Sequence, residues 1–529
     1  MDDRIFIIGI GGTGMRCLES FVHLCAMGMF DNTTIEMLAL DTDRENGNFR
    51  RLYDLADTYN KCKGVNKDQH PLGNTFFSAK INYYQYSPDY SRQETGNFAR
   101  LTKFGDLRYK NKEQADIAEL LYTQNTREFD LKHGYRAQTN LGSFLMYHNI
   151  LEEVTQNHDG PLAKYISNLV TAGKAKVFVM GSVFGGTGAS SIPVIPKAFA
   201  EAAKILMPGS SIKDVFFGAI LLTSYFTFKV PSNDYVARQR VVATSDKFAL
   251  NSQAAMMFYD KDKTVKKTYQ KFYMLGTSGL NFMTDHGESE TLTGGSNQEN
   301  DSHYIELFAA FAAYDFFQAS YDELGRIRGD ANGVKYYYRT IREDGVLEFT
   351  DFVKPAEVEK LSKRFGMMVV MSWLVNIAEF YSAAQTGDLK KNNIIGYEDI
   401  DPREVEAMKK YCTYFHFKLD EGAIRNGWLR QLHNSAGGGD KFLFNSELFS
   451  NNSEREMTKY TFNSKLYKGD FEQHAYNTSF FSNSASKAFD TFKDSFIKYQ
   501  DNPNISNKCE KLTKRIYDTL CDLYKFSSN

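Results

Sequence analysis

Short apolar runs that end in glycine-rich or acidic segments recur through the first half of the chain. Five of them are apolar enough for strands that are covered on both faces, at residues 4–8, 35–40, 177–180, 213–222 and 271–275. Apolar residues recur at helical spacing over residues 15–29, 143–155, 192–206, 234–255 and 302–319. Strands that alternate with helices predict a parallel sheet with helices on both faces, so the expected fold class is α/β.

The segment at residues 302–319 has the strongest helical pattern and is apolar almost all the way round. A helix of that kind is buried, so we expect it to form the core of the domain. By contrast, residues 44–130 are rich in charged and aromatic side chains and have weak periodicity. They predict an elaborated insertion with short helices, the clearest at 116–122, and with surface tyrosines at Tyr83, Tyr84, Tyr86 and Tyr90.

The last third of the chain is predicted to be mostly helical. Helical patterns cover residues 357–384, 401–414, 484–499 and 507–526. The pattern gives no sign of a second, strand-rich domain.

The composition is that of an ordinary globular protein, with 42% apolar and 24% charged residues among 529. The formal net charge of −2 gives no overall basic surface for nucleic acid. The six cysteines lack close metal-ligand spacing, the N-terminus does not resemble a signal peptide, and no apolar run is long enough to span a bilayer. We therefore expect a reduced, cytoplasmic chain that binds no nucleic acid and does not span a membrane.

A glycine-rich loop joins the first expected strand to its helix. Its candidate binding residues are Gly9, Gly11, Gly12, Thr13 and Gly14. Glycines lack the Cβ atoms that would hold a backbone away from a ligand, so this loop could approach a pyrophosphate closely. Dinucleotide-binding and adenylate-forming Rossmann proteins also carry such loops, so the class of nucleotide stays open.

A second glycine-rich loop follows the strand at residues 177–180. Its candidate binding residues are Gly185, Gly186, Thr187, Gly188, Ala189 and Ser190. We expect free backbone amides and the positive end of the helix at 192–206 to converge there, which suits phosphate. Bulk at Gly12 or Gly186 should then exclude the ligand. The alternative is a tight strand-to-helix turn without a ligand.

Two carboxylates, Asp41 and Asp43, follow the strand at residues 35–40. In a doubly wound sheet, carboxylates at that strand end face the ligand crevice. They are candidates to contact a ribose or, through water, a Mg²⁺ ion. The alternative for each is a solvated loop.

A third loop contains Gly134, Ala137 and Gly142 and precedes the helix expected at 143–155. In this order, the loops resemble those of the tubulin and FtsZ superfamily, and the chain looks closest to its divergent bacterial tubulin-like proteins. Residues 185–190 resemble the tubulin signature loop, residues 9–14 the first nucleotide loop, and the third loop the Gly-Ala-Gly loop of FtsZ. The chain departs from the family at Phe184, where three consecutive glycines are usual, and at Thr13.

This resemblance covers about the first 350 residues. It implies a Rossmann-like, tubulin/FtsZ-type GTPase domain with a long central helix, which binds GTP or GDP with Mg²⁺ and self-associates into filaments or oligomers. We expect a nucleotide-binding domain at 1–296, the core helix at 297–320, a partly helical second domain at 321–434 and a helical region at 435–529. The start of the core helix usually reads the base in this family, which makes candidates of Asn297, Asn300, Tyr304 and Glu306. The alternative is that these four residues only cap and solvate the helix start.

The segment Glu348-Phe349-Thr350-Asp351 has the spacing of the acidic pair that FtsZ carries after its core helix. A water that attacks a γ-phosphate needs a carboxylate to orient it and to accept a proton. Glu348 and Asp351 are therefore the candidate catalytic residues, and the resemblance implies that they act on the nucleotide of a neighbouring subunit. The alternative is that they cap the helix expected near Pro355.

Two other functions stay open. The first is a non-polymerising, nucleotide-dependent scaffold or switch whose C-terminal third binds a protein partner. The second is a Rossmann enzyme that uses NAD or ATP, which would explain residues 9–14 but gives no role to residues 185–190. The sequence does not decide between GTP and ATP.

Overall fold

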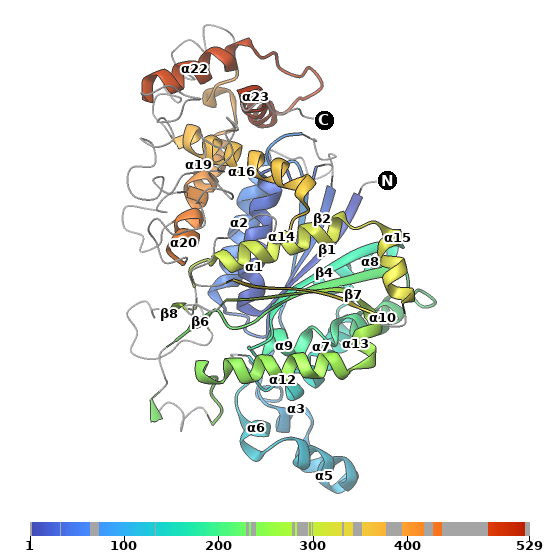
Figure 1. The fold of residues 1–529 in the computed structure, drawn as a ribbon. Helices are drawn as coiled ribbons and strands as arrows, with labels where there is room; N and C mark the ends of the chain where they lie inside the picture. Colours follow the sequence, from blue (N-terminus) through green and yellow to red (C-terminus); the bar gives the residue numbers. More distant parts are fainter. Residues whose placement is uncertain are drawn as a thin grey trace.

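The computed structural model describes residues 3–31, 33–63, 74–132, 134–228, 232–233, 240–277, 281–282, 295, 298, 300–330, 333–341, 352–376, 394–416, 427–435 and 485–523. At its centre is a seven-stranded sheet, and every neighbouring pair of its strands is parallel (Figure 1). The strands are β1 (Asp3–Ile10), β2 (Thr33–Leu40), β3 (Lys80–Tyr86), β4 (Ala175–Ser182), β5 (Val215–Leu222), β7 (Tyr269–Thr277) and β9 (Lys335–Ile341). The predicted α/β class is confirmed.

The strand order is β3-β2-β1-β4-β5-β7-β9. The chain therefore moves outward in one direction from β1 to β3 and then returns to build the other half from β4. This is a doubly wound, Rossmann-like arrangement, and its switch point lies between β1 and β4. In such sheets the ligand crevice lies beyond the carboxyl ends of the two strands at the switch point.

Helices cover both faces of the sheet because the inner strands are apolar on both sides. Figure 1 shows α1 (Gly11–Ala26), α2 (Gly47–Lys63) and α14 (Tyr304–Gln318) on one face. The other face carries α7 (Thr139–Gln156), α8 (Pro161–Ala172), α9 (Thr187–Ser191), α10 (Ile195–Leu206), α12 (Phe248–Lys261) and α13 (Lys263–Thr268). Alternate side chains of one strand enter opposite cores, as Ile7 and Ile8 of β1 do.

The predicted core helix is confirmed as α14, in which thirteen residues are buried. Its start is closed by a capping box. The backbone N–H of His303 donates to Glu306 Oε2 at 2.9 Å, and His303 Nδ1 accepts the N–H of Ile305 at 3.2 Å. Glu306 is therefore a capping residue, which was the alternative to its role in reading a base.

The segment at residues 44–130 differs from the predicted insertion. It begins with α2, supplies β3 to the sheet, and only then forms the short helices α3 (Phe98–Leu101), α4 (Phe104–Lys110), α5 (Lys112–Leu121) and α6 (Gln124–Glu128). Its tyrosines do not simply lie on the surface, because Tyr86 and Tyr90 are buried and Tyr83 and Tyr84 are half-buried. Within β3, Tyr83 packs against Tyr53 of α2 on one face of the sheet, and Tyr84 packs against Tyr165 of α8 on the other.

Among the described residues, the helix predicted at 234–255 is confirmed at 248–255 and wrong at 240–247. Residues 241–244 are irregular, a short 3₁₀ turn spans Ser245–Lys247, and α12 runs from Phe248 to Lys261. The sheet also extends beyond the first predicted domain. α15 (Tyr321–Gly329) leads to β9, which pairs with β7 at the edge of the sheet.

The described C-terminal elements are helical apart from irregular segments. They are α16 (Pro355–Asn376), α19 (Pro402–His416), α20 (Trp428–Ser435), α22 (Ala485–Lys498) and α23 (Lys508–Leu523), with a 3₁₀ turn at Tyr397–Asp399. α16 and α19 pack together, and α19 and α23 also contact α2. Across the described residues, we find no helix that combines the length and apolarity needed to span a membrane.

Candidate nucleotide site

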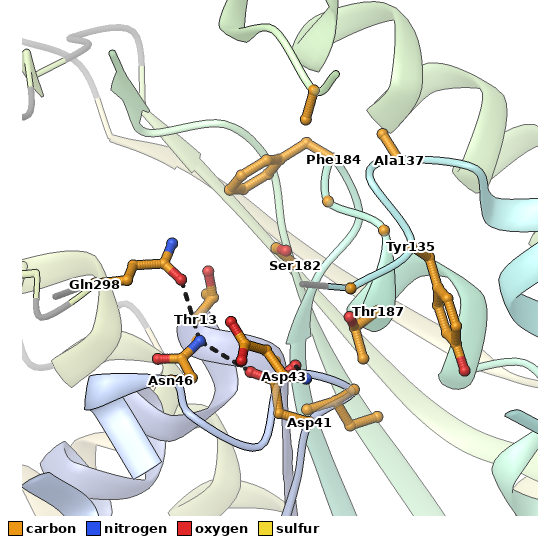
Figure 2. Close-up of a pocket in the computed structure, with 18 of the residues that line it drawn as sticks. Thr13, Asp41, Asp43, Asn46, Tyr135, Ala137, Ser182, Phe184, Thr187 and Gln298 are labelled. Atoms are coloured by element: carbon orange, nitrogen blue, oxygen red, sulfur yellow. Dashed lines mark hydrogen bonds between the residues drawn. The ribbon is translucent and has the colours of Figure 1, made fainter. Parts of the chain in front are cut away.

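A pocket lies beyond the carboxyl ends of β1 and β4, at the switch point of the sheet (Figure 2). Segments from seven parts of the chain line it: the start of α1, the turn after β2, the loop at 134–137, the loop after β4, the segment after β5, residues 243–248 up to the start of α12, and the segment before α14. Its described lining residues are Ile10, Gly11, Gly12, Thr13, Arg16, Asp41, Asp43, Asn46, Gly134, Tyr135, Arg136, Ala137, Ser182, Phe184, Gly185, Gly186, Thr187, Gly188, Phe226, Phe228, Ala243, Phe248, Gln298 and Asn300. All three predicted glycine loops therefore meet at one pocket.

The first glycine loop delivers the N-terminus of α1 to this pocket. α1 begins at Gly11, whose φ of +69° is in the region that favours glycine, and no side chain caps the helix. The first-turn amides of a helix have no intrahelical acceptor and lie at the positive end of its dipole. Gly11, Gly12 and Thr13 line the pocket, so these amides can serve an anion.

Gly9 and Gly14 have a different role from the one predicted, because neither lines the pocket. A Cβ atom at Gly14 would lie 2.7 Å from the backbone carbon of Gly9 and 2.8 Å from the backbone oxygen of Met180. The two glycines allow α1 to pack directly against β1 and β4. They therefore position the loop without contacting a ligand.

The glycines of the loop after β4 also differ in their surroundings. At Gly185 a Cβ atom would meet only Ser182 Oγ, at 3.2 Å, so this position is open towards the pocket. At Gly186 a Cβ atom would lie 2.8 Å from the backbone nitrogen of Ala137. Gly186 also lines the pocket, so the expectation that bulk there excludes the ligand stays a prediction, but the added atoms would in addition displace the neighbouring loop.

The helix that follows is also interrupted. The five-residue α9 contains Ala189 and Ser190, and α10 starts only at Ile195. Neither Ala189 nor Ser190 lines the pocket: Ala189 accepts the hydroxyl of Tyr259 at 2.6 Å, and Ser190 is fully buried. The helix predicted at 192–206 therefore does not begin at this loop, whereas α1 does begin at the pocket.

The third loop packs against the turn after β2 and the loop after β4. Gly134 has a φ of +89°, and Arg136 and Ala137 also adopt left-handed conformations, with φ of 45° and 61°. Thr42 Oγ1 and Thr187 Oγ1, 3.0 Å apart, join the turn after β2 to the loop after β4 beside Gly134. Non-glycine residues in this conformation are uncommon and cluster at functional sites.

Gly142 does not belong to the pocket. It lies within α7, which begins at Thr139, earlier than predicted. A Cβ atom there would overlap Ser190 Oγ. This glycine lets α7 pack against α9, so its predicted part in binding is corrected.

Asp41 and Asp43 reach the pocket from the end of β2, and both are buried (Figure 2). Burial, reinforced by the charge of Asp43, raises the pKa of Asp41 to about 7. Asp41 Oδ1 accepts the N–H of Thr42 at 2.7 Å, and its Oδ2 accepts Asn46 Nδ2 at 3.1 Å. The same Asn46 amide donates to Gln298 Oε1 at 3.1 Å, so Asn46 links the carboxylate to Gln298 (Figure 2).

The raised pKa of Asp41 predicts a specific pH dependence of stability. Its folded-state value exceeds its ordinary value of 3.8, so the folded chain binds more protons than the unfolded chain between about pH 4 and 7. This group therefore lowers the free energy of unfolding as the pH rises, by at most about 1.4 kcal/mol per pH unit. Asp41→Asn should remove that contribution, measured by urea unfolding at several pH values. The exposed control Asp116→Asn should keep the pH dependence of the parent protein. If Asp41→Asn keeps it too, the assignment is contradicted.

Arg16 was not predicted, although it lines the pocket from the second turn of α1. Its guanidinium is buried and donates to Glu306 Oε1 at 2.6 Å, the hydroxyl of Tyr225 at 2.7 Å and Asn300 Oδ1 at 3.2 Å. Burial lowers the pKa of Arg16, but the charges and hydrogen bonds of Glu306 and Tyr225 together outweigh burial and raise the pKa overall. Asn300 also accepts, through its backbone oxygen, a hydrogen bond from Arg51.

An aromatic wall closes one side of the pocket, and it too was not predicted. It consists of Phe184, Phe226, Phe228 and Phe248. Ring centroids lie 4.6 Å apart for Phe184 and Phe248 and 5.4 Å apart for Phe184 and Phe226. Phe248 contacts each of the other three rings, and Phe184, the residue after Val183 in the loop that follows β4, contacts two of them. Aromatic faces provide stacking surfaces for a base.

The remaining predicted residues differ in whether they line the pocket. Asn300 lines the pocket, whereas Tyr304 does not and its hydroxyl lies 3.1 Å from Thr277 Oγ1. Asn297, Glu348 and Asp351 lie outside the described residues. Their roles stay predictions.

The carboxylate pair fits a magnesium ion that also binds a ligand. No group of three or more His, Cys, Asp or Glu residues in the described part of the chain could hold a metal alone. Mg²⁺, however, is usually bound by one or two carboxylates with the phosphates of the ligand and water. Asp41 and Asp43 are the residues that would hold it.

Comparison with known proteins gave no matching family model and no significantly similar curated protein. The interpretation of the pocket therefore depends on its geometry and on the pattern of its loops.

Proposed function

We propose that this chain binds GTP or GDP with Mg²⁺ and couples GTP hydrolysis to self-assembly into filaments or oligomers. The observation that carries the proposal is the meeting of three glycine-containing loops at the switch point of the sheet. In a doubly wound fold this is where nucleotides bind. The preference for guanine and the assembly derive from the resemblance of the loops to those of tubulin and FtsZ.

The pocket supports a nucleotide with a defined orientation. The amides at the start of α1 and the loop at 134–137 would receive the phosphates, next to Asp41 and Asp43 with their magnesium ion. The aromatic wall and Asn300 lie on the side that would receive the ribose and the base. Bound Mg²⁺ would neutralise charge on the phosphates, and the buried Asp41 would release its proton to bind it.

Hydrolysis is proposed to occur across a subunit contact. The resemblance places Glu348 and Asp351 on the face opposite the bound phosphates, so these carboxylates would orient water in the site of the next subunit. Turnover per subunit should then rise with protein concentration, and sedimentation with GTP should reveal larger species than sedimentation without it. Turnover that is independent of concentration would contradict assembly-dependent hydrolysis. GTP binding without GTP-dependent assembly would instead support the scaffold or switch.

Asp351→Ala is expected to slow hydrolysis by about 10²–10⁴-fold, because it removes a group that orients water and accepts a proton. GTP affinity should be nearly unchanged, since the side chain contacts no nucleotide in its own chain. Assemblies should persist longer, and the variant should inhibit the parent protein when the two are mixed. Steady-state phosphate release from the variant, the parent and mixtures checks this result. Full activity of Asp351→Ala would return the loop to a capping role.

A dinucleotide enzyme is the second candidate. A glycine loop after β1 with a carboxylate at the end of β2 is the arrangement that binds the pyrophosphate and ribose of NAD. This alternative assigns no role to the loop after β4, which occupies the same pocket. Parallel titrations with GTP, ATP and NAD separate the candidates.

A further inference from the structure

A second pocket lies at the opposite end of the sheet from the nucleotide site. β5 begins in it, at Val215, and runs for eight residues to Leu222, beside the loops described above. Eight residues of strand span about 25 Å, so the two pockets are separate sites. The second pocket has a volume of about 440 Å³, within the range of small-molecule sites. It is lined by Pro196, Lys197, Ala200, Lys204, Ser211, Ile212, Lys213, Val215, Phe217, Thr264, Lys267, Thr268 and Arg328.

Five cations come together in this pocket from separate elements. Lys197 and Lys204 come from α10, Lys213 from the segment before β5, Lys267 from α13 and Arg328 from α15. No carboxylate is present among the described residues that line it. One of the lysines, Lys204, forms an exposed ion pair with Glu201 outside the lining, at 3.0 Å. The lining therefore carries five positive charges and no negative one, although Asp214, next to the lining, interacts with the charge of Arg328.

Arg328 is fixed in place. Its guanidinium donates to the backbone oxygens of Lys213 and Val215 and lies 3.9 Å from the centroid of the Phe216 ring. It therefore ties α15 to the start of β5 and holds the segment that carries Lys213. Next to it, Ser211 Oγ accepts the N–H of Lys213 at 3.1 Å, which leaves the hydroxyl proton of Ser211 available to a ligand.

The floor of the pocket is apolar. Ile212, Val215 and Phe217 are buried, and Pro196 and Ala200 of α10 continue the surface. A ligand that fits both parts has an apolar body and a multiply charged anionic group. Phosphate fits this set of groups, because lysine ammonium groups form strong charge-assisted hydrogen bonds to phosphate oxygens and a hydroxyl can donate another.

We infer that this pocket binds an organic phosphate ester with an apolar body, at a site independent of the nucleotide pocket. The phosphate would lie among the lysines and the apolar body against Ile212 and Phe217. A free metabolite and the headgroup of an anionic lipid share this chemistry. The test below distinguishes the two sources.

Pyridoxal 5′-phosphate is a suitable probe because it carries a phosphate, an aromatic body and an aldehyde. Its aldehyde condenses with a lysine Nζ, releasing one water and forming an imine, which borohydride reduces to a stable secondary amine. The full-length chain is treated with limiting probe and reduced, and the modified lysines are mapped by mass spectrometry. Lys197, Lys213 and Lys267 should be modified about tenfold faster than the exposed Lys110 and Lys112, because the charged pocket concentrates the anion. The nucleotide pocket contributes no described lysine, so its occupancy does not affect this readout.

Two variants make the test specific. Lys213→Gln/Lys267→Gln should reduce modification of Lys197 about tenfold, whereas the matched Lys110→Gln/Lys112→Gln should leave it unchanged. Inorganic pyrophosphate should protect the pocket lysines in the parent protein. Equal modification of all exposed lysines, or no protection by pyrophosphate, would overturn the proposal.

Vesicles containing phosphatidic acid identify the source of the phosphate. If the ligand is a free metabolite, the parent chain should not co-sediment with them, although pyrophosphate still protects its lysines. If it is a lipid headgroup, the parent and the control variant should co-sediment with the vesicles and the pocket variant should not. Co-sedimentation that is the same for the pocket variant and the parent would contradict a lipid role for this pocket.

Discussion

Gly185→Val is expected to weaken GTP binding by at least about 100-fold while leaving the fold intact. A Cβ atom at Gly185 would meet only Ser182 Oγ within the protein, at 3.2 Å, so the two methyl groups of valine would occupy space that lines the pocket. The measurement is equilibrium binding of a fluorescent GTP analogue, with circular dichroism and thermal unfolding as tests of the fold.

The matched control for this variant is Gly325→Val. Gly325 lies in α15, away from the nucleotide pocket, and a Cβ atom there would have no neighbour within 4 Å. Gly325→Val should bind GTP as the parent does. If Gly185→Val also binds GTP with unchanged affinity and stability, the ligand does not occupy the loop after β4.

Arg16→Met should destabilise the chain by about 3–5 kcal/mol. Arg16 and Glu306 form a buried ion pair. Removing the guanidinium would leave the Glu306 carboxylate buried without a counter-ion among the residues that the structure describes, next to the hydroxyl of Tyr225 and the N–H of His303. A buried charge that loses its counter-ion costs far more than the pair contributes. Denaturant unfolding followed by circular dichroism measures the loss.

A second variant separates the unpaired charge from the lost packing. Arg16→Met/Glu306→Gln removes both charges and should recover a large part of the lost stability. A loss of less than about 1 kcal/mol in Arg16→Met would argue against a coupled buried pair. So would additive effects, in which the double variant loses as much stability as the two single variants Arg16→Met and Glu306→Gln lose together.

The inner strands could be predicted from the sequence because their signal is local. β1, β4 and β5 are continuous apolar runs that end in glycine or polar residues, and both faces of each are buried. β3 and β9 could not, because they are edge strands rich in tyrosine and charge, with sequences KINYYQY and KYYYRTI. An edge strand is half exposed, so its apolar pattern is weak.

The glycine loops could be located from the sequence, but the role of each glycine could not. Gly9, Gly14 and Gly142 allow close packing between elements, whereas Gly11 and Gly185 face the pocket. Only tertiary contacts distinguish these two uses of a missing Cβ atom.

Arg16 shows the same limit for charged residues. It lies in an apolar helix, and its partner Glu306 is 290 residues away in the sequence. A single arginine in an apolar helix indicates a buried partner but does not identify it. The aromatic wall likewise joins Phe184 to residues that follow β5 and begin α12.

The most direct test of the central claim is calorimetric titration of the nucleotide-free chain with GTP in the presence of Mg²⁺, alongside ATP and NAD. The account predicts saturable binding of GTP at one site per chain, tighter than binding of ATP or NAD, and lost in Gly185→Val. Absence of saturable GTP binding by the parent chain, or tightest binding of NAD that is unaffected by Gly185→Val, would contradict it.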